Sequence, residues 1–212
     1  HDKRNMRSHE LFLKYIFDPE IIYPSEMAQT TKKNLFLNRE ITRVSDNFTD
    51  LNFLKVIPVN GKSVLIIGID SNELYTDVGF AEEEILHAIS DKIDQMEYDV
   101  SLLLIHHSIL GTDAEPLKNS LRVTDFVRKH KIENVFCGHT HELEVRRSVD
   151  LYHGHAFTQF MCGSLSSSLH INDDNMFLYY ENWDTDDPLV HLVRIFTQGG
   201  KVHFEREYIE HL

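Results

Sequence analysis

The sequence has few of the features that mark specialised classes of protein. Its 212 residues include only two cysteines, Cys137 and Cys162, which excludes a disulfide framework and favours reduced, buried thiols in a cytoplasmic protein. Unbroken apolar runs are short, as at Leu102 to Ile105, whereas a membrane-spanning helix needs about 20 apolar residues. No secretory signal opens the sequence. We therefore expect a cytoplasmic protein without a membrane partner.

Basic residues are also scarce relative to acidic ones. There are 21 Lys and Arg residues against 34 Asp and Glu residues, so the formal net charge is −13. Such a surface repels phosphate backbones and anionic lipids, which disfavours nucleic acids and membrane surfaces as partners. A bound metal ion can reverse the potential inside a single cleft. With 42% hydrophobic and 26% charged residues, the composition is that of one globular domain over residues 1–212.

Residues 63–137 alternate between short apolar runs and amphipathic stretches. The apolar runs predict three buried strands, at 63–67, 100–105 and 132–136. Helical spacing of apolar residues predicts two helices between them, at 82–96 and 117–130. In the second helix, Leu121, Phe126 and Val127 are expected to point inward. This βαβαβ order is typical of an α/β fold with a parallel inner sheet.

The segments before this unit carry weaker signals. Asn60-Gly61 separates the apolar run 53–57 from the strand at 63–67, which is the strongest short signal for a β-hairpin. Residues 7–16 have helical spacing and are predicted to form a helix. Residues 17–50 lack periodicity and are predicted to form a long irregular connection.

The C-terminal part of the chain carries no helix signal of any length. Five strands are predicted there, at 144–148, 156–161, 176–180, 191–196 and 202–208. Gly199-Gly200 marks a hairpin turn between the last two of them. We therefore expect residues 142–212 to add an antiparallel layer to the same domain.

Histidine is abundant, with 14 copies, and its placement suggests a site. The strand at 100–105 runs into His106-His107, and the strand at 132–136 runs into Cys137 and then Gly138-His139-Thr140-His141. In open α/β sheets, ligands bind beyond the carboxyl ends of the strands. Gly138 is expected to let the chain turn sharply there. We therefore predict that His106, His139 and His141 converge on a metal site.

The remaining candidates receive simpler interpretations. His107 is expected to line the cleft or to support a ligand rather than to bind the metal itself. His153 and His155 either form a surface turn or line the cleft. Cys137 is interpreted as a small buried residue rather than a thiolate ligand. Arg146 and its neighbour are expected to make salt bridges on a strand face.

These segments resemble the calcineurin-like metallophosphoesterases. Residues 103–107 (Leu-Leu-Ile-His-His) and 137–141 (Cys-Gly-His-Thr-His) resemble the fourth and fifth sequence blocks of that family. Residues 68–71 (Gly-Ile-Asp-Ser) and 160–164 (Phe-Met-Cys-Gly-Ser) resemble two further strand ends of the family. His1-Asp2 resembles the end of the Gly-Asn-His-Asp block, so we expect the chain to start within that block, with the upstream blocks and N-terminal strands missing.

The resemblance implies a layered β-sandwich flanked by helices and a centre of two divalent ions, Mn, Fe or Zn. It implies hydrolysis of a small phosphomonoester or phosphodiester. His106 and His139 would bind one ion, His141 the other, and His1 would act as the general acid. Because the other ligands would be missing, this chain alone is expected to be inactive.

Two other functions are compatible with the same fold. One is a non-catalytic scaffold that binds protein partners, and the retained histidines argue against it. The other is a nuclease of the same superfamily, which the net charge of −13 disfavours. The natural substrate, the metal and the oligomeric state are left open by the sequence.

Overall fold

The computed structural model describes residues 20–21, 31–34, 39–42, 52–72, 78–111, 117–140, 142–163, 175–182 and 189–209. Seven strands form the large sheet, in the spatial order β1 (Glu20–Ile21), β4 (Phe53–Val59), β5 (Lys62–Ile69), β6 (Val100–Ile105), β7 (Asn134–Cys137), β9 (His155–Met161) and β8 (Glu144–Asp150). A smaller sheet contains β10 (Asn175–Glu181), β11 (Leu189–Gln198) and β12 (Lys201–Ile209). A two-stranded sheet contains β2 (Thr31–Asn34) and β3 (Arg39–Thr42).

The centre of the large sheet is parallel, as the sequence predicts. β5 pairs with β6, and β6 pairs with β7, in parallel registers. β4 joins β5 through Asn60-Gly61, whose φ angles of 50° and 83° are those of a type I′ turn. The helices α2 (Glu83–Ile93) and α3 (Ser120–Lys129) form the two crossovers. The predicted βαβαβ unit is therefore confirmed.

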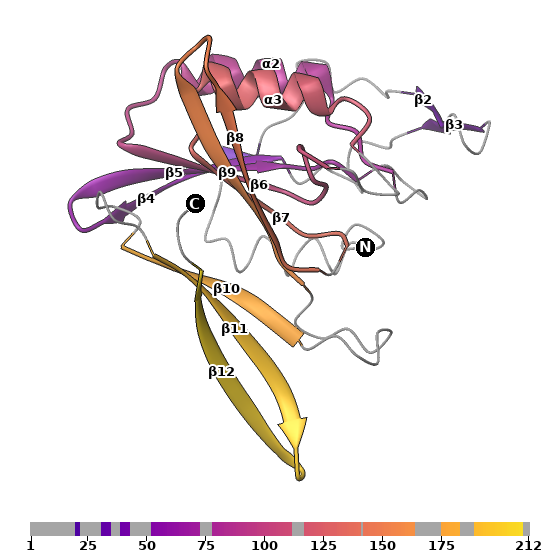
Figure 1. The fold of residues 1–212 in the computed structure, drawn as a ribbon. Helices are drawn as coiled ribbons and strands as arrows, with labels where there is room; N and C mark the ends of the chain where they lie inside the picture. Colours follow the sequence, from indigo (N-terminus) through magenta and orange to yellow (C-terminus); the bar gives the residue numbers. More distant parts are fainter. Residues whose placement is uncertain are drawn as a thin grey trace.

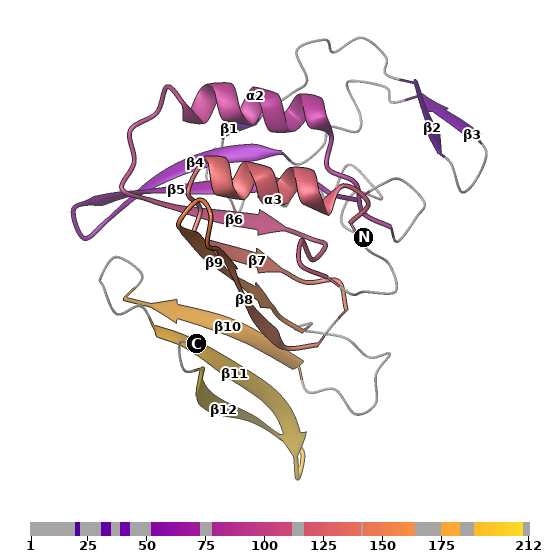
Figure 2. The same ribbon diagram turned by 45° about the horizontal axis from the view of Figure 1, so that its top comes forward.

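Both helices lie on the same face of the large sheet (Figure 2). α2 has Glu83 and Glu84 in its first turn and Lys92 in its last, which complements the helix dipole. Its buried stripe packs on the sheet and consists of Ile85, Leu86, Ile89 and Ile93. The helix-facing side of the strands is fully apolar at Leu65, Ile67 and Leu103, so the main core lies in this layer.

The inward face of α3 differs from the prediction at one position. Val123, Phe126 and Val127 are buried, but the side chain of Leu121 is 79% exposed. Two residues of an α-helix span about 200°, so a helix that buries Val123 turns Leu121 toward the solvent. The expectation that Leu121 points inward is wrong.

The small sheet approaches the other face of the large sheet (Figure 1). Tyr180 of β10 contacts Phe136 of β7 and Phe160 of β9, with ring centroids 5.5 Å and 6.2 Å away. Burial in this contact raises the pKa of Tyr180 to about 12. The molecule is thus layered, with helices on one face and an antiparallel sheet on the other.

The strands after residue 141 divide differently from the expectation. β9 pairs with β7 in parallel and β8 pairs with β9 in antiparallel fashion, so both extend the large sheet. β9 buries side chains on both of its faces, including Phe157 and Phe160, and therefore fits beside β7. Only β10 to β12 form the separate antiparallel layer.

The segment 17–50 is not wholly irregular, because β1, β2 and β3 fall within it. β1 pairs with β4, and β2 pairs with β3, both in antiparallel fashion. The helix predicted at 7–16 lies outside the described residues. Among the helices that the structure describes, none is both long enough and apolar enough to cross a lipid bilayer.

Candidate metal centre

Three parallel strands bring their carboxyl ends to one edge of the large sheet. β5 is followed by Ser71, β6 by His106 and His107, and β7 by Gly138 and His139. The parallel registers of β5 with β6 and of β6 with β7 place these segments side by side. The N–H of Gly138 donates to the carbonyl of His106 at 3.1 Å and joins the last two segments. The edge predicted from the sequence is therefore where the histidines lie.

His106, His107 and His139 form one cluster. The candidate ligand atoms of the three rings all lie within 4.8 Å of one another. Nδ1 of His139 is 3.2 Å from Nε2 of His106, and the ring of His139 lies 4.4 Å from that of His107, centroid to centroid. His107 is buried, and the other two rings are half-buried and reachable from outside. The cluster could hold a metal ion.

The buried ring of His107 is fixed from two sides. Its Nδ1 lies 2.9 Å from Oγ of Ser71, and its backbone N–H donates to the same oxygen at 3.3 Å. Gly79 lies against the ring, where a Cβ would come within 2.5 Å of Cγ. For Nε2 of His107 to bind a cation, Nδ1 must carry the proton and donate a hydrogen bond to Oγ of Ser71. In that tautomer Oγ accepts from both the ring and the backbone N–H of His107.

The backbone of His139 adopts a strained turn. Its φ angle is 80°, and the N–H of Thr140 donates to the carbonyl of Gly138 at 3.2 Å, so His139 is the central residue of a γ-turn. A left-handed φ is uncommon for a residue with a side chain and costs roughly 1–3 kcal/mol. Gly138 was expected to supply the sharp turn, but the left-handed conformation lies at His139 instead. The γ-turn places the ring of His139 against those of His106 and His107.

The loop that follows His107 is held by a buried amide. Oε1 of Gln159 accepts hydrogen bonds from the N–H groups of Ile109, at 2.8 Å, and Leu110, at 3.2 Å. Nε2 of Gln159 donates to Oγ of Ser108 at 2.9 Å. Because Gln159 lies on β9, this amide attaches the loop to the sheet. It thereby fixes the segment that directly follows His107.

The donor set fits one ion rather than two. Three neutral imidazoles are the number of protein ligands that a catalytic zinc site uses, and imidazole suits Zn, Fe and other transition metals. Within the part of the chain that the structure describes, the cluster contains no carboxylate to bridge a second ion. Two of the predicted site residues, His1 and His141, lie outside the described residues. Cys137 is buried and is absent from the cluster, which agrees with its interpretation as a small packing residue.

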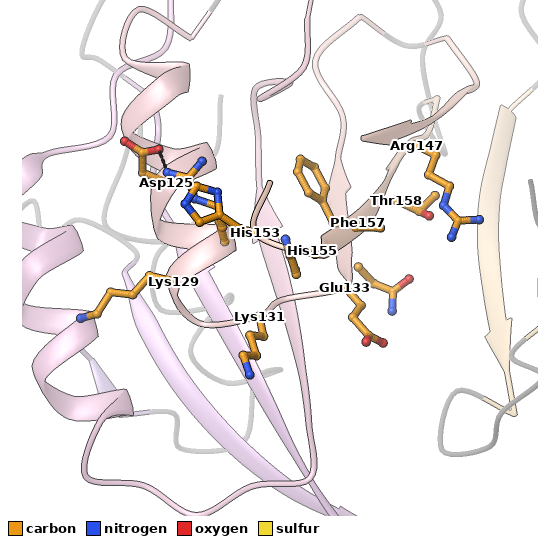
Figure 3. A pocket seen from close by; sticks show the side chains of 13 residues that line it. Asp125, Lys129, Lys131, Glu133, Arg147, His153, His155, Phe157 and Thr158 are labelled. Carbon is orange, nitrogen blue, oxygen red and sulfur yellow. Dashed lines mark hydrogen bonds and ion pairs between the residues drawn. The ribbon is translucent and has the colours of Figure 1, made fainter. Parts of the chain in front are cut away.

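A separate hollow lies at the opposite end of the strands, and Figure 3 shows the side chains that line it. It has a volume of about 790 Å³ and is bordered by the start of β7, the start of β9 and the end of α3. Lys129 and Lys131 lie on one side of it and Arg147 on the other, with His155 between them. The hollow lies at the amino ends of the strands, whereas the histidine cluster lies at their carboxyl ends, so the two sites are far apart.

His153 and His155 belong to this hollow. His153 lies in the β8–β9 turn, where its Nδ1 is 2.7 Å from Oδ2 of Asp150. The N–H and the ring of His153 hold the pKa of Asp150 well below its usual range. Nε2 of His155 donates to the carbonyl of Ile132 at 3.2 Å. His153 therefore lies in a surface turn, whereas His155 begins β9 and lines the hollow; neither belongs to the described histidine cluster.

Sequence reasoning missed the residues that support the cluster. Ser71 was noted only as part of a strand end, and nothing in the sequence pointed to Gly79 or Gln159. Each of the three contacts His107 or the loop after it from a position at least 28 residues away in the chain. Local sequence patterns do not encode such contacts. His107 was placed beside the site and lies within the group of candidate ligands.

Comparisons with known proteins find weak structural similarity. No family model and no curated protein matches the chain. A hypothetical protein from Thermus thermophilus is 11% identical over 73% of this chain and 61% of its own, with a TM-score of 0.37. GAP50, described as the anchor in the inner membrane complex of Plasmodium, is 12% identical over 78% and 59%, with a TM-score of 0.39.

Vps29 from Entamoeba histolytica, solved in complex with Zn, is 13% identical over 68% of this chain and 98% of its own, with a TM-score of 0.27. Vps29 has a calcineurin-like metallophosphoesterase fold. The chain spans about three fifths of the length of the first two proteins. With identities and TM-scores this low, none of these similarities carries an argument about function.

Proposed function

We propose that the protein to which this chain belongs hydrolyses phosphomonoesters or phosphodiesters, using a divalent metal ion held by His106, His107 and His139. The observation that supports this proposal is the convergence of three imidazoles within 4.8 Å at the carboxyl edge of parallel strands. When bound there, a divalent ion polarises a phosphate oxygen and lowers the pKa of a bound water. The resemblance of the strand ends to calcineurin-like metallophosphoesterases supports the substrate class.

Within this proposal, the chain's own residues have distinct roles. Oγ of Ser71 accepts a hydrogen bond from Nδ1–H of His107 and so directs its Nε2 toward the ion. The γ-turn at His139 and the bond from Gly138 to His106 hold the other two rings in place. His141 is proposed as a ligand of a second ion, and His1 as the general acid that protonates the leaving oxygen.

Metal binding by the chain itself is the first test. Co²⁺ gives visible absorption bands when imidazole nitrogens bind it, so a titration followed by absorption reports on the donor set. We expect His106→Ala and His139→Ala each to weaken binding at least about tenfold. His87→Ala removes an exposed histidine of α2 and serves as the matched control, with unchanged binding. Equal binding by all three variants would contradict the site.

Activity is the second test and needs the complete protein. We expect Mn-dependent hydrolysis of bis(p-nitrophenyl) phosphate that is lost in His106→Ala and His139→Ala, and negligible turnover by the 212-residue chain. Robust turnover by this chain would show that its own residues supply all the ligands that the reaction requires. A complete protein that binds metal through these histidines but hydrolyses no phosphoester would support the scaffold alternative instead.

A further inference from the structure

The small sheet exposes an apolar face. The large hydrophobic side chains that are exposed on it are Tyr179 (47%), Val202 (61%), Phe204 (69%) and Tyr208 (44%). The strand register places Tyr179, His191 and Tyr208 in one row, and alternation along β12 puts Val202 and Phe204 on the same side. Figure 1 shows β12 at the free edge of the small sheet, with its turn projecting away from the large sheet.

The polar residues on this face are typical of protein interfaces. The guanidinium of Arg206 lies over the ring of Tyr179 at 5.5 Å and pairs with Glu181 at 2.8 Å. His191 is buried next to the rings of Tyr179 and Tyr208. Tyrosine and arginine are the residue types that carry much of the binding energy in protein interfaces. This face therefore fits a protein partner better than a small ligand.

The outer edge of β12 offers its backbone for pairing. β11 and β12 are joined by Gly199-Gly200, whose φ angles of 58° and 73° define a two-residue type I′ turn. Such a turn closes on a hydrogen-bonded pair, which here is Gln198 with Lys201. Every second residue from Val202 onward therefore directs its N–H and C=O away from β11. Within the described residues, no strand pairs with this edge.

We propose that β12 pairs in antiparallel fashion with β12 of a second copy of this chain, centred on Phe204. In that register the two Phe204 side chains face each other, and Val202 faces Arg206. The backbone groups of these residues point outward, so they can form the hydrogen bonds of the new ladder. The two small sheets then become one continuous six-stranded sheet.

Charge complementarity selects this register and this partner. Pairing centred on Phe204 places Lys201 opposite Glu207 and His203 opposite Glu205, each pair twice by symmetry. These pairs occupy the positions without ladder hydrogen bonds, where side chains of facing strands lie closest. Centring the pairing on Glu205 would oppose two carboxylates, and centring it on Arg206 would oppose two guanidinium groups. Charged side chains on an edge strand usually prevent it from pairing with other strands. Here the same charges are complementary to those of a second β12.

The test is the association of the 212-residue chain in solution, and it does not depend on the metal site. Because one strand junction buries less surface than a standard interface, we expect a dimer with a micromolar dissociation constant. Sedimentation velocity from low to several hundred micromolar should show the transition. Lys201→Glu and Glu207→Lys should each weaken association about tenfold or more, because like charges then face each other.

Charge exchange makes the test specific. The double variant Lys201→Glu/Glu207→Lys restores opposite charges and should dimerise like the parent chain. A mixture of the two single variants should form a heterodimer, since both facing pairs of residues 201 and 207 are then opposite in sign. Both side chains are exposed, and the only ion pair that either makes within the described residues joins Glu207 to Arg194 at 3.7 Å on the surface, so circular dichroism should show unchanged folding.

A matched pair of variants tests whether the dimer forms through β12 or through another exposed apolar surface. Phe204→Lys should abolish the dimer, whereas Leu121→Lys, which replaces a comparably exposed side chain of α3, should leave it intact. A parent chain that stays monomeric throughout the concentration range would overturn the proposal. So would a dimer that survives both single charge reversals, because the copies would then meet elsewhere.

Discussion

A single methyl group at Gly79 should disturb the histidine cluster. A Cβ on Gly79 would lie 2.5 Å from Cγ and 2.6 Å from Nδ1 of His107, whereas ordinary van der Waals contact begins at 3.4 Å. The backbone of Gly79 cannot retreat easily, because it bridges to Asn72 and Leu117, and its carbonyl accepts the N–H of Lys118 at 2.9 Å. The ring of His107 is only 1% exposed and must move by roughly 1 Å within packed surroundings.

The expected cost follows from two opposing effects. Overpacking of a buried site costs about 1–3 kcal/mol, while Gly→Ala lowers the entropy of the unfolded chain and returns about 0.4–1 kcal/mol. Gly79→Ala should therefore lower the free energy of unfolding by about 1.3 kcal/mol at the midpoints of these ranges and by about 2.6 kcal/mol at most. Displacing His107 also loosens its bond to Ser71, so Zn²⁺ affinity should fall roughly 10- to 100-fold.

Gly138→Ala is the matched control beside the same cluster. A Cβ on Gly138 would meet only the carbonyl oxygen of Cys162, at 4.0 Å, and Gly138 does not have a left-handed φ. This variant should be as stable as the parent or slightly more stable. Urea unfolding and Zn²⁺ titration of both variants provide the comparison. If Gly79→Ala matches Gly138→Ala in both measurements, the packing of Gly79 on His107 does not position the site.

Three further variants test the core, a buried histidine and the support of the cluster. Leu103→Ala removes a fully buried side chain and should lower the free energy of unfolding by about 2–5 kcal/mol in urea titrations, whereas Leu121→Ala should change it by less than about 0.5 kcal/mol. Burial against α2 lowers the pKa of His130, so the unfolded chain binds more protons and stability should fall as the pH drops below about 6.5. His130→Gln should flatten this pH dependence in urea titrations across that range, and an unchanged slope would contradict the assignment. Ser71→Ala should weaken Co²⁺ binding roughly 10- to 100-fold in the absorption titration, and unchanged affinity would show that Ser71 does not orient His107.

The parts of the fold that local patterns encode could be predicted. Asn60-Gly61 specified a hairpin because few other residues tolerate two successive left-handed φ angles. The βαβαβ unit followed from alternating periods of apolar residues. The position of β9 could not be predicted, because whether a strand joins β7 or β10 depends on pairing between distant segments. Leu121 was misplaced although the helical period itself excludes it, because a residue five positions from Phe126 lies about 140° away from it around the helix.

The candidate site divides in the same way. His106 and His139 could be found because each follows a parallel strand, and such strands end at one edge. The role of His107 could not be assigned, since it depends on Ser71 and Gly79, which lie 36 and 28 positions earlier in the chain. The sharp turn was expected at Gly138, and the structure places the left-handed residue one position later.

Departures from local rules distinguish the histidine cluster from the hollow at the opposite end of the strands. The cations around the hollow have ordinary explanations: Arg128 pairs with Asp125 and Asp150, and Lys129 complements the C-terminal dipole of α3. Even the left-handed φ of 51° at Lys131 belongs to a helix-capping motif, in which the N–H of Ile132 donates to the carbonyl of Val127.

No such motif accounts for His139. Its left-handed φ closes no helix, and a glycine precedes it that could adopt the same conformation at lower cost. What the conformation achieves is the meeting of three imidazoles, one of them buried, which gain little from one another without a cation. Natural sequences depart from local preferences chiefly where function requires it. These departures support the histidine cluster, rather than the hollow, as the site of the proposed function.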